Sequence, residues 1–152
     1  MTETHAPEAQ NVRRAPEVGH APQPPGVERA TIYSDVVEFV ENYLSVLYRR
    51  QVSDLSDTVW CREWWKHPEA LVRLDALWRA WEHLRQDSAT GMSVWLLDHA
   101  DPHMKVLLDP RGPFKYCSVR NGHKDMLGPL PLTAPPEGLF SDPDYSELPL
   151  HG

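Results

Sequence analysis

Apolar residues recur three or four positions apart after Ser34, and this spacing is typical of an amphipathic helix. The stripe consists of Val36, Val40, Tyr43 and Leu47, widened by Val37 and Leu44. Ser34 is the expected N-cap, because its hydroxyl can accept a hydrogen bond from a free amide of the first turn. Arg49 and Arg50 suit the negative end of the helix dipole. The pattern therefore predicts a helix between Ser34 and Arg50.

A second helix is predicted inside residues 60–85, a stretch that holds five of the six tryptophans. The fixed φ of Pro68 suits the first position of a helix, and the negative charge of Glu69 beside it favours the positive end of the helix dipole. The apolar face carries Leu71, Leu74, Trp78 and Trp81, widened by Ala70, Leu77 and Leu84. Because so broad a stripe can cover two neighbours, we expect this helix to be central and to pack against two others.

A third helix is predicted to begin near Met92, after a turn at 87–91. The Asp101-Pro102 pair resembles the N-cap and first residue of a new helix, so we expect a kink or break near Ala100. A short fourth helix would then cover 104–108.

These elements predict an all-α domain of three to four helices within residues 31–125. Only two of the 15 prolines fall inside the helical part, and most of the others lie near the two ends of the chain. Residues 1–30 have too few large apolar side chains to offset the entropy of ordering, and residues 126–152 are acidic and proline-rich. Both are therefore expected to be disordered tails.

The net charge of −7 comes mostly from these tails, since residues 31–125 contain fourteen acidic and twelve basic side chains. The domain therefore lacks the basic excess typical of nucleic-acid binding. No run of about eighteen apolar residues occurs, and no early apolar run follows a basic segment. We expect neither a membrane span nor a signal peptide, and a cytoplasmic location. Cys61 and Cys117 would then stay reduced rather than form a disulfide.

The most specific chemical pattern is a repeated spacing of cysteine and histidine. His67 follows Cys61 by six positions, and His123 follows Cys117 by six positions. Zinc in structural sites takes about four thiolate or imidazole ligands in a tetrahedral arrangement, and two such pairs supply them. The pattern predicts a structural zinc site made by these four residues.

The zinc ion would staple residues 109–125 to the start of the central helix. This segment has too many turn formers for a helix, and we expect it to lie against the core through Phe114 and Tyr116. Metal binding can contribute the folding free energy that such a segment lacks. The competing interpretation is that Cys61 is a small buried apolar residue and His67 only a neighbour of the helix N-terminus. The five-residue gaps favour this alternative, since gaps of about two to four are usual.

The segment DHADPH gathers Asp98, His99, Asp101 and His103. On an unbroken helix both histidines would share one face, and either could replace one of the four zinc ligands. The favoured interpretation is structural, with Asp101 as a helix cap and Asp98 orienting a histidine. A metal-dependent hydrolase at His99, Asp101 and His103 is the least favoured function, because it requires an open coordination position.

No recognisable catalytic constellation occurs: Ser93 lacks the nucleophile-elbow pattern, and there is no phosphate-binding or dinucleotide motif. We therefore expect a non-enzymatic protein that binds a protein partner. Trp64 and Trp65 are adjacent and cannot both face inward from a helix, so one of them is the expected contact. The alternative is a nucleic-acid-binding accessory factor. Its candidate contacts are the basic residues that the staple would gather, namely Arg62, Lys66, Lys115, Arg120 and Lys124.

Three blocks of sequence, WCREWWKHPEA, TGMSVWLLDHADPH and GPFKYC, are followed by a late histidine. Together they resemble an actinobacterial domain family of unknown function, over about residues 33 to 123. Members of that family occur in phages, plasmids and integrated conjugative elements. The resemblance therefore implies an accessory protein of a mobile element. It implies no activity and no catalytic residue.

Overall fold

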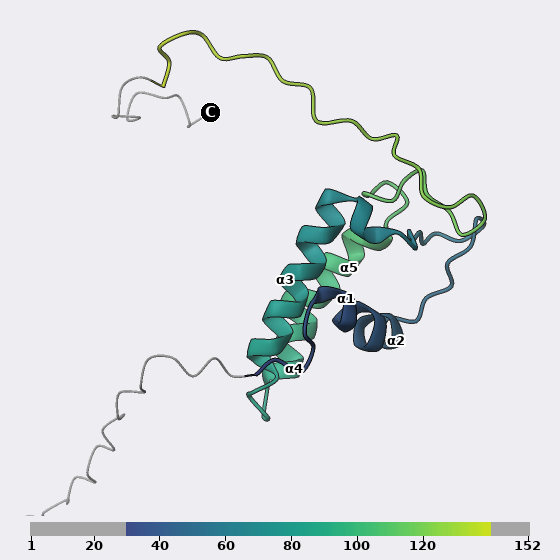
Figure 1. The fold of residues 1–152 in the computed structure, drawn as a ribbon, viewed down its shortest axis with the longest axis vertical. Coiled ribbons are helices and arrows are strands. Elements are labelled where there is room, and N and C mark those ends of the chain that lie inside the picture. The colour runs from purple at the N-terminus through teal and green to yellow at the C-terminus, as the bar shows by residue number, and fades with distance from the viewer. Residues whose placement is uncertain (1–29, 141–152) are drawn as a thin grey trace, which may run out of the picture. The chain divides into compact units, whose positions relative to one another are not determined.

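The computed structural model describes residues 30–140. The predicted N-terminal tail, apart from Ala30, and residues 141–152 of the predicted C-terminal tail lie outside the described residues. The described part is helical and contains no strand, which confirms the all-α class. The helices follow one another in three segments (Figure 1): α1 (Val36–Phe39), η1 (Val40–Leu44) and α2 (Ser45–Leu47); η2 (Trp64–Lys66) and α3 (Pro68–Leu84); α4 (Gly91–Val94), η3 (Trp95–Ala100) and α5 (Asp101–Leu108).

The first segment begins one residue later than predicted. Asp35, and not Ser34, is the N-cap, since its side chain accepts a hydrogen bond from the Glu38 amide at 2.9 Å. Ser34 instead donates its amide and its hydroxyl to the Glu38 carboxylate, so this carboxylate accepts from the residue before the N-cap rather than from the N-cap amide of a capping box. The segment ends at Leu47, because Tyr48 leaves the helical conformation.

The buried face of this segment is rotated from the predicted stripe. Phe39, Val40 and Leu44 are buried, whereas Val37 and Leu47 are exposed. Phe39 was not part of the predicted stripe, yet its ring packs against those of Tyr33, Tyr43, Trp81 and Trp95.

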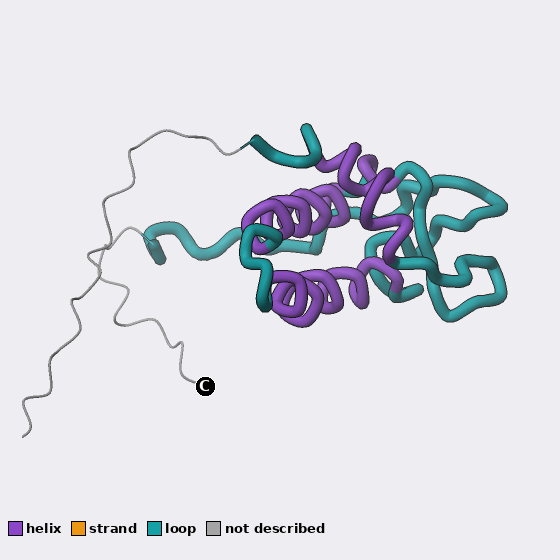
Figure 2. Tube along the Cα trace, turned by 90° about the horizontal axis from the view of Figure 1, so that it is seen from below, coloured by secondary structure: helices purple, strands orange, loops and turns teal. Residues whose placement is uncertain are grey.

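The central position of α3 is confirmed. It contacts α1, and it contacts the segment from α4 to α5, which runs beside it in both views (Figures 1 and 2). Its buried residues are Ala70, Leu74, Leu77, Trp81 and Glu82. Leu71, which was predicted on this face, is 40% exposed. Trp95 fills the interface with α3 and donates its indole N–H to the Leu77 carbonyl at 3.0 Å.

Of the predicted kink or break near Ala100, the break is wrong, and the irregularity at this place is a π-helical stretch that ends at Ala100. Asp101 has helical backbone angles, and α5 continues η3 directly. Residues of η3 form a π-helix, in which each hydrogen bond spans one residue more than in an α-helix. Pro102 has no N–H, and in a regular α-helix its ring would clash with the carbonyl four residues earlier. The wider turn of η3 relieves that clash, so the helix continues through Pro102.

Glu82 is a buried carboxylate that attaches Ile32 and Tyr33 to the end of α3. Its Oε1 accepts the amides of Ile32 at 2.9 Å and Tyr33 at 3.0 Å, and its Oε2 accepts from Arg85 Nε at 2.6 Å. Burial alone would raise the pKa of Glu82, but these donors together hold it below its usual range. The ionised form is therefore favoured in the folded protein.

We predict that Glu82→Gln destabilises the protein by about 1.5–3 kcal/mol at pH 7, because the charge-assisted hydrogen bonds are lost. A carboxylate with a lowered pKa stabilises the fold above its unfolded pKa of about 4.3, and this contribution is lost as the pH falls through the folded pKa. The difference between wild type and variant should therefore shrink at acid pH.

Urea unfolding of both proteins at neutral and at acid pH measures this difference, with the exposed Glu41→Gln as the matched control. The contributions of other titrating groups to the free energy of unfolding cancel, because the two proteins are compared at the same pH. A difference that stays constant with pH would contradict the role assigned to the Glu82 charge.

Candidate metal centre

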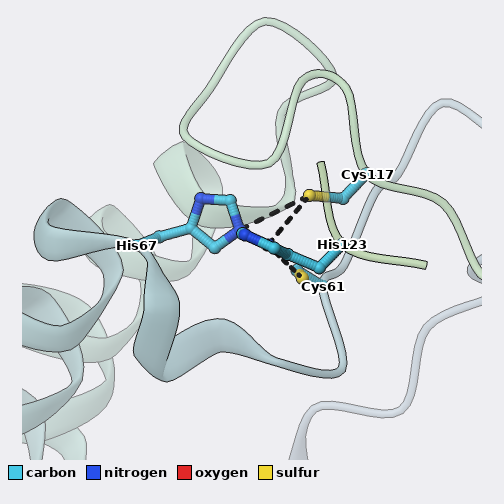
Figure 3. A group of neighbouring side chains, drawn as sticks. All are labelled: Cys61, His67, Cys117 and His123. Carbon is cyan, nitrogen blue, oxygen red and sulfur yellow. Dashed lines mark hydrogen bonds between the residues drawn. The ribbon is translucent and has the colours of Figure 1, made fainter. Parts of the chain in front are cut away.

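Four side chains from two distant parts of the chain converge at one site (Figure 3). Cys61 and His67 stand on either side of η2, and Cys117 and His123 come from the segment after α5. One ligand atom from each residue lies within 4.8 Å of the other three. The sequence prediction that these four residues meet is therefore confirmed.

The first pair is brought together by a short 3₁₀ turn. The Lys66 amide donates to the Glu63 carbonyl at 3.0 Å, and the His67 amide donates to the Trp64 carbonyl at 3.1 Å. This turn reverses the chain between the two ligands. His67 is also the N-cap residue of α3, so Pro68 and the helix fix the position of its backbone.

The second pair is brought together by a tight hairpin. Ser118 and Gly122 exchange both backbone hydrogen bonds, at 3.2 and 2.9 Å, which places the flanking Cys117 and His123 opposite each other. Gly122 has a φ of 74°, a left-handed conformation that glycine adopts without steric cost. The Asn121 amide donates to the Ser118 hydroxyl at 2.8 Å and tightens the turn.

Four of the six separations between the ligand atoms are close to the edges of a tetrahedral zinc site, and all six are within 4.8 Å. With Zn–S of about 2.3 Å and Zn–N of about 2.0–2.1 Å, a tetrahedron has S–N edges of about 3.6 Å and an N–N edge of about 3.3 Å. The S–N distances are 3.4 Å from Cys117 to His67 Nε2, 3.6 Å from Cys61 to His123 Nδ1, and 3.9 Å from Cys117 to His123 Nδ1. The two ring nitrogens are 3.0 Å apart. Each value lies within a few tenths of an ångström of the expected edge.

The site is largely withdrawn from solvent, and this controls its protonation. Cys61 is 1% and Cys117 5% exposed, and both are free thiols. Burial raises the pKa of Cys61 to about 11, and burial together with the nearby His123 lowers the pKa of His67. His67 is thus neutral, which is the form that binds metals. A bound cation would deprotonate the thiols outright, so metal binding would release protons.

A second layer of contacts orients the ligands. The Lys124 amide donates to the Cys117 sulfur at 3.4 Å, and the Glu63 amide donates to the Cys61 sulfur. His67 donates to the backbone carbonyl of Pro113, so the ring nitrogen that does not face the site is occupied. Such outer contacts fix ligand geometry in metal proteins. They come from backbone atoms, for which the sequence carries no side-chain signal.

Aromatic packing explains how the segment after α5 reaches the site. Phe114 is fully buried, as predicted, and its ring lies edge-on to His67 at 4.9 Å and to Trp60 at 5.2 Å. Tyr116, which was also predicted to face the core, is 41% exposed. The Lys115 ammonium lies over its ring at 5.1 Å.

The histidines of DHADPH do not join the site. In residues 30–140 no second group of potential metal ligands assembles around them. His103 Nδ1 accepts a hydrogen bond from Arg73 at 3.0 Å, and Asp101 accepts one from the Tyr48 hydroxyl rather than capping a helix. Asp98 is exposed. The structure therefore assembles neither the alternative ligands His99 and His103 nor the hydrolase set.

The other candidate residues lie on the surface around the site. Trp64 is buried, whereas Trp65 is 52% exposed, so one tryptophan of the pair is available for contact. All five candidate basic residues are exposed, and each is within three positions of a ligand: Arg62, Lys66, Lys115, Arg120 and Lys124. Lys66 forms an ion pair with Glu63. No helix in residues 30–140 has the length and apolar character needed to span a membrane.

Comparison with known proteins adds a family but no activity. No curated protein and no solved structure matches the chain. A family model described as Domain of unknown function (DUF4913) matches residues 33–136, a range that includes all three helical segments and all four residues of the candidate metal centre. The match covers more than half of the chain, and the chain belongs to this family.

Proposed function

We propose that this protein is a non-enzymatic interaction protein in which one structural zinc ion holds the segment after α5 against the start of α3. The observation that carries this proposal is the convergence of Cys61, His67, Cys117 and His123 within 4.8 Å, with the four sulfur–nitrogen and nitrogen–nitrogen distances of 3.0–3.9 Å that suit a shared ion. Thiolate and imidazole ligands suit zinc and disfavour magnesium or calcium, which take oxygen ligands.

A structural role follows from the closed ligand set. Catalytic zinc sites use three protein ligands and keep a position for water or substrate, whereas four protein ligands fill the coordination sphere. Three of the four ligands here are buried and the fourth is half-buried. The proposed ion therefore contributes folding free energy rather than chemistry.

The interaction role is supported by the surface beside the site. Trp65, two positions before His67, exposes about half of its side chain, and its ring packs edge-on against buried Trp64 at 5.9 Å. A rigidly held exposed tryptophan is a common anchor in protein interfaces. We propose a protein partner at Trp65, a cytoplasmic location that keeps the thiols reduced, and an accessory role in a mobile element such as a phage, plasmid or conjugative element.

The second candidate function is nucleic-acid binding. It is favoured by one observation, which is that Arg62, Arg120 and Lys124 are exposed on the segments that meet at the metal centre. Their charges would stand together although the whole chain has a net charge of −7. A local cluster of this kind can neutralise phosphates even in an acidic protein.

The untagged protein should contain a single zinc ion per chain. His123→Ala should lose this zinc and lower the free energy of unfolding by about 2 kcal/mol or more, which corresponds to roughly 8–16 °C in Tm for a domain of this size. Elemental analysis and thermal unfolding measure both effects. His83→Ala, at an exposed histidine of α3, is the matched control and should change neither. If the protein without bound metal has the same Tm as the wild-type protein with it, the proposal is wrong.

Binding to DNA at several salt concentrations separates the two functions. The leading proposal expects no retention on DNA at low salt. Under the second candidate, the triple change Arg62→Gln, Arg120→Gln and Lys124→Gln should reduce the slope of log affinity against log salt by about 2–3. The same change at Arg49, Arg79 and Lys105, which are exposed elsewhere, is the control. If the protein is retained on DNA, and if this retention depends steeply on salt and only on Arg62, Arg120 and Lys124, the second candidate is the function.

A further inference from the structure

A partly enclosed apolar pocket of about 140 Å³ lies between the first helical segment and α5. Val40, Leu44 and Met104 line it, and none of them is more than 4% exposed. The remaining apolar lining is provided by Val52, Trp60 and Leu108. Burying an apolar group against this lining would be favourable, because both surfaces would be removed from water.

The rim of the pocket is held in place before any ligand arrives. The Tyr48 hydroxyl donates to Asp101 Oδ1 at 2.5 Å, which ties the end of the first segment to the first residue of α5. The guanidinium of Arg50 lies over the Tyr48 ring, 5.3 Å from its centroid. A preformed rim lowers the entropy lost on binding.

The charged residue at the rim of the pocket indicates which class of ligand would bind there. Arg50 is the single charged residue among those that line the pocket. It also lines the adjoining open cleft of about 490 Å³, in which Asp109 is paired with Arg111 and Asp101 with Tyr48. Lys105 and Asp57 are the other charged residues of that cleft. A guanidinium can bind a carboxylate through two parallel hydrogen bonds, so an anionic group is the expected polar end.

We propose that this pocket binds a small aromatic carboxylate, with its ring among Val40, Leu44 and Met104 and its carboxylate at Arg50. The size agrees with a single ring, since an apolar cavity of about 150 Å³ engineered in another protein accommodates benzene. This binding site is separate from the proposed zinc ligands and does not depend on a bound metal.

Phenylpropionate is a suitable probe, compared with toluene and with phenylpropylamine, which carry the same ring with no charge or the opposite charge. We expect phenylpropionate to bind with a dissociation constant of about 1 mM and to bind tightest of the three. In a heteronuclear NMR titration the shifted amides should be those of residues 40–60 and 104–108. Arg50→Gln should weaken phenylpropionate roughly tenfold and leave toluene unchanged.

Val52→Phe should fill the pocket and abolish binding, whereas Leu55→Phe, in the same loop but 99% exposed, should not. Arg50 is exposed, so its variant tests the carboxylate contact even if Val52→Phe fails to fold. The proposal is overturned if the three probes bind equally, if Arg50→Gln has no effect on phenylpropionate, or if no amide in these ranges shifts at millimolar concentration. None of these outcomes bears on zinc content, so the two proposals fail independently.

Discussion

The meeting of two distant segments at four ligand atoms is the constraint that positions the chain after α5. The contacts join residues 50 to 62 positions apart, and closing loops of that length costs conformational entropy. Residues 109–125 contain no helix to offset this cost. Buried Phe114 contributes apolar area, but in the hairpin from Cys117 to His123 only Cys117 is buried. The proposed zinc ion would supply the missing free energy, because a cation attracts both thiolates and fixes both imidazoles.

A row of aromatic rings connects this site to the helical core. His67 packs against Phe114, Phe114 packs against Trp60, and Trp60 lines the apolar pocket beside Met104. The proposed metal centre and the proposed ligand pocket are therefore separate but are linked through the rings of Phe114 and Trp60. Truncating Trp60 would remove packing from Phe114 and from the pocket, whereas the polar contacts of each site would remain. Trp60 therefore lies between the two sites, although it is neither a proposed zinc ligand nor a polar group of the pocket.

The sequence predicts the helices and the ligand set because both depend on local residue types, but it does not predict contacts that depend on distant parts of the chain. Ser34 and Asp35 are both good caps, and only the backbone conformation decides between them. Pro102 normally ends a helix, yet burial of Ala100 and Met104 favours a continued helix with a π turn. Glu82 occupies an apolar face because its donors come from residues 32 and 33, about fifty positions away.

The gaps of five residues within each ligand pair, which weakened the metal interpretation, have a structural explanation. One gap is closed by the 3₁₀ turn of η2 and the other by the Ser118–Gly122 hairpin, so different local structures bring the two pairs to one site. In the proposed function this ligand set leaves no coordination position for a substrate. The exposed residues next to the ligands, such as Arg62, Trp65 and Lys124, would then make the contacts with a partner. Because the staple would fix their backbone, these side chains would lose less entropy on binding than the same residues in a loose loop.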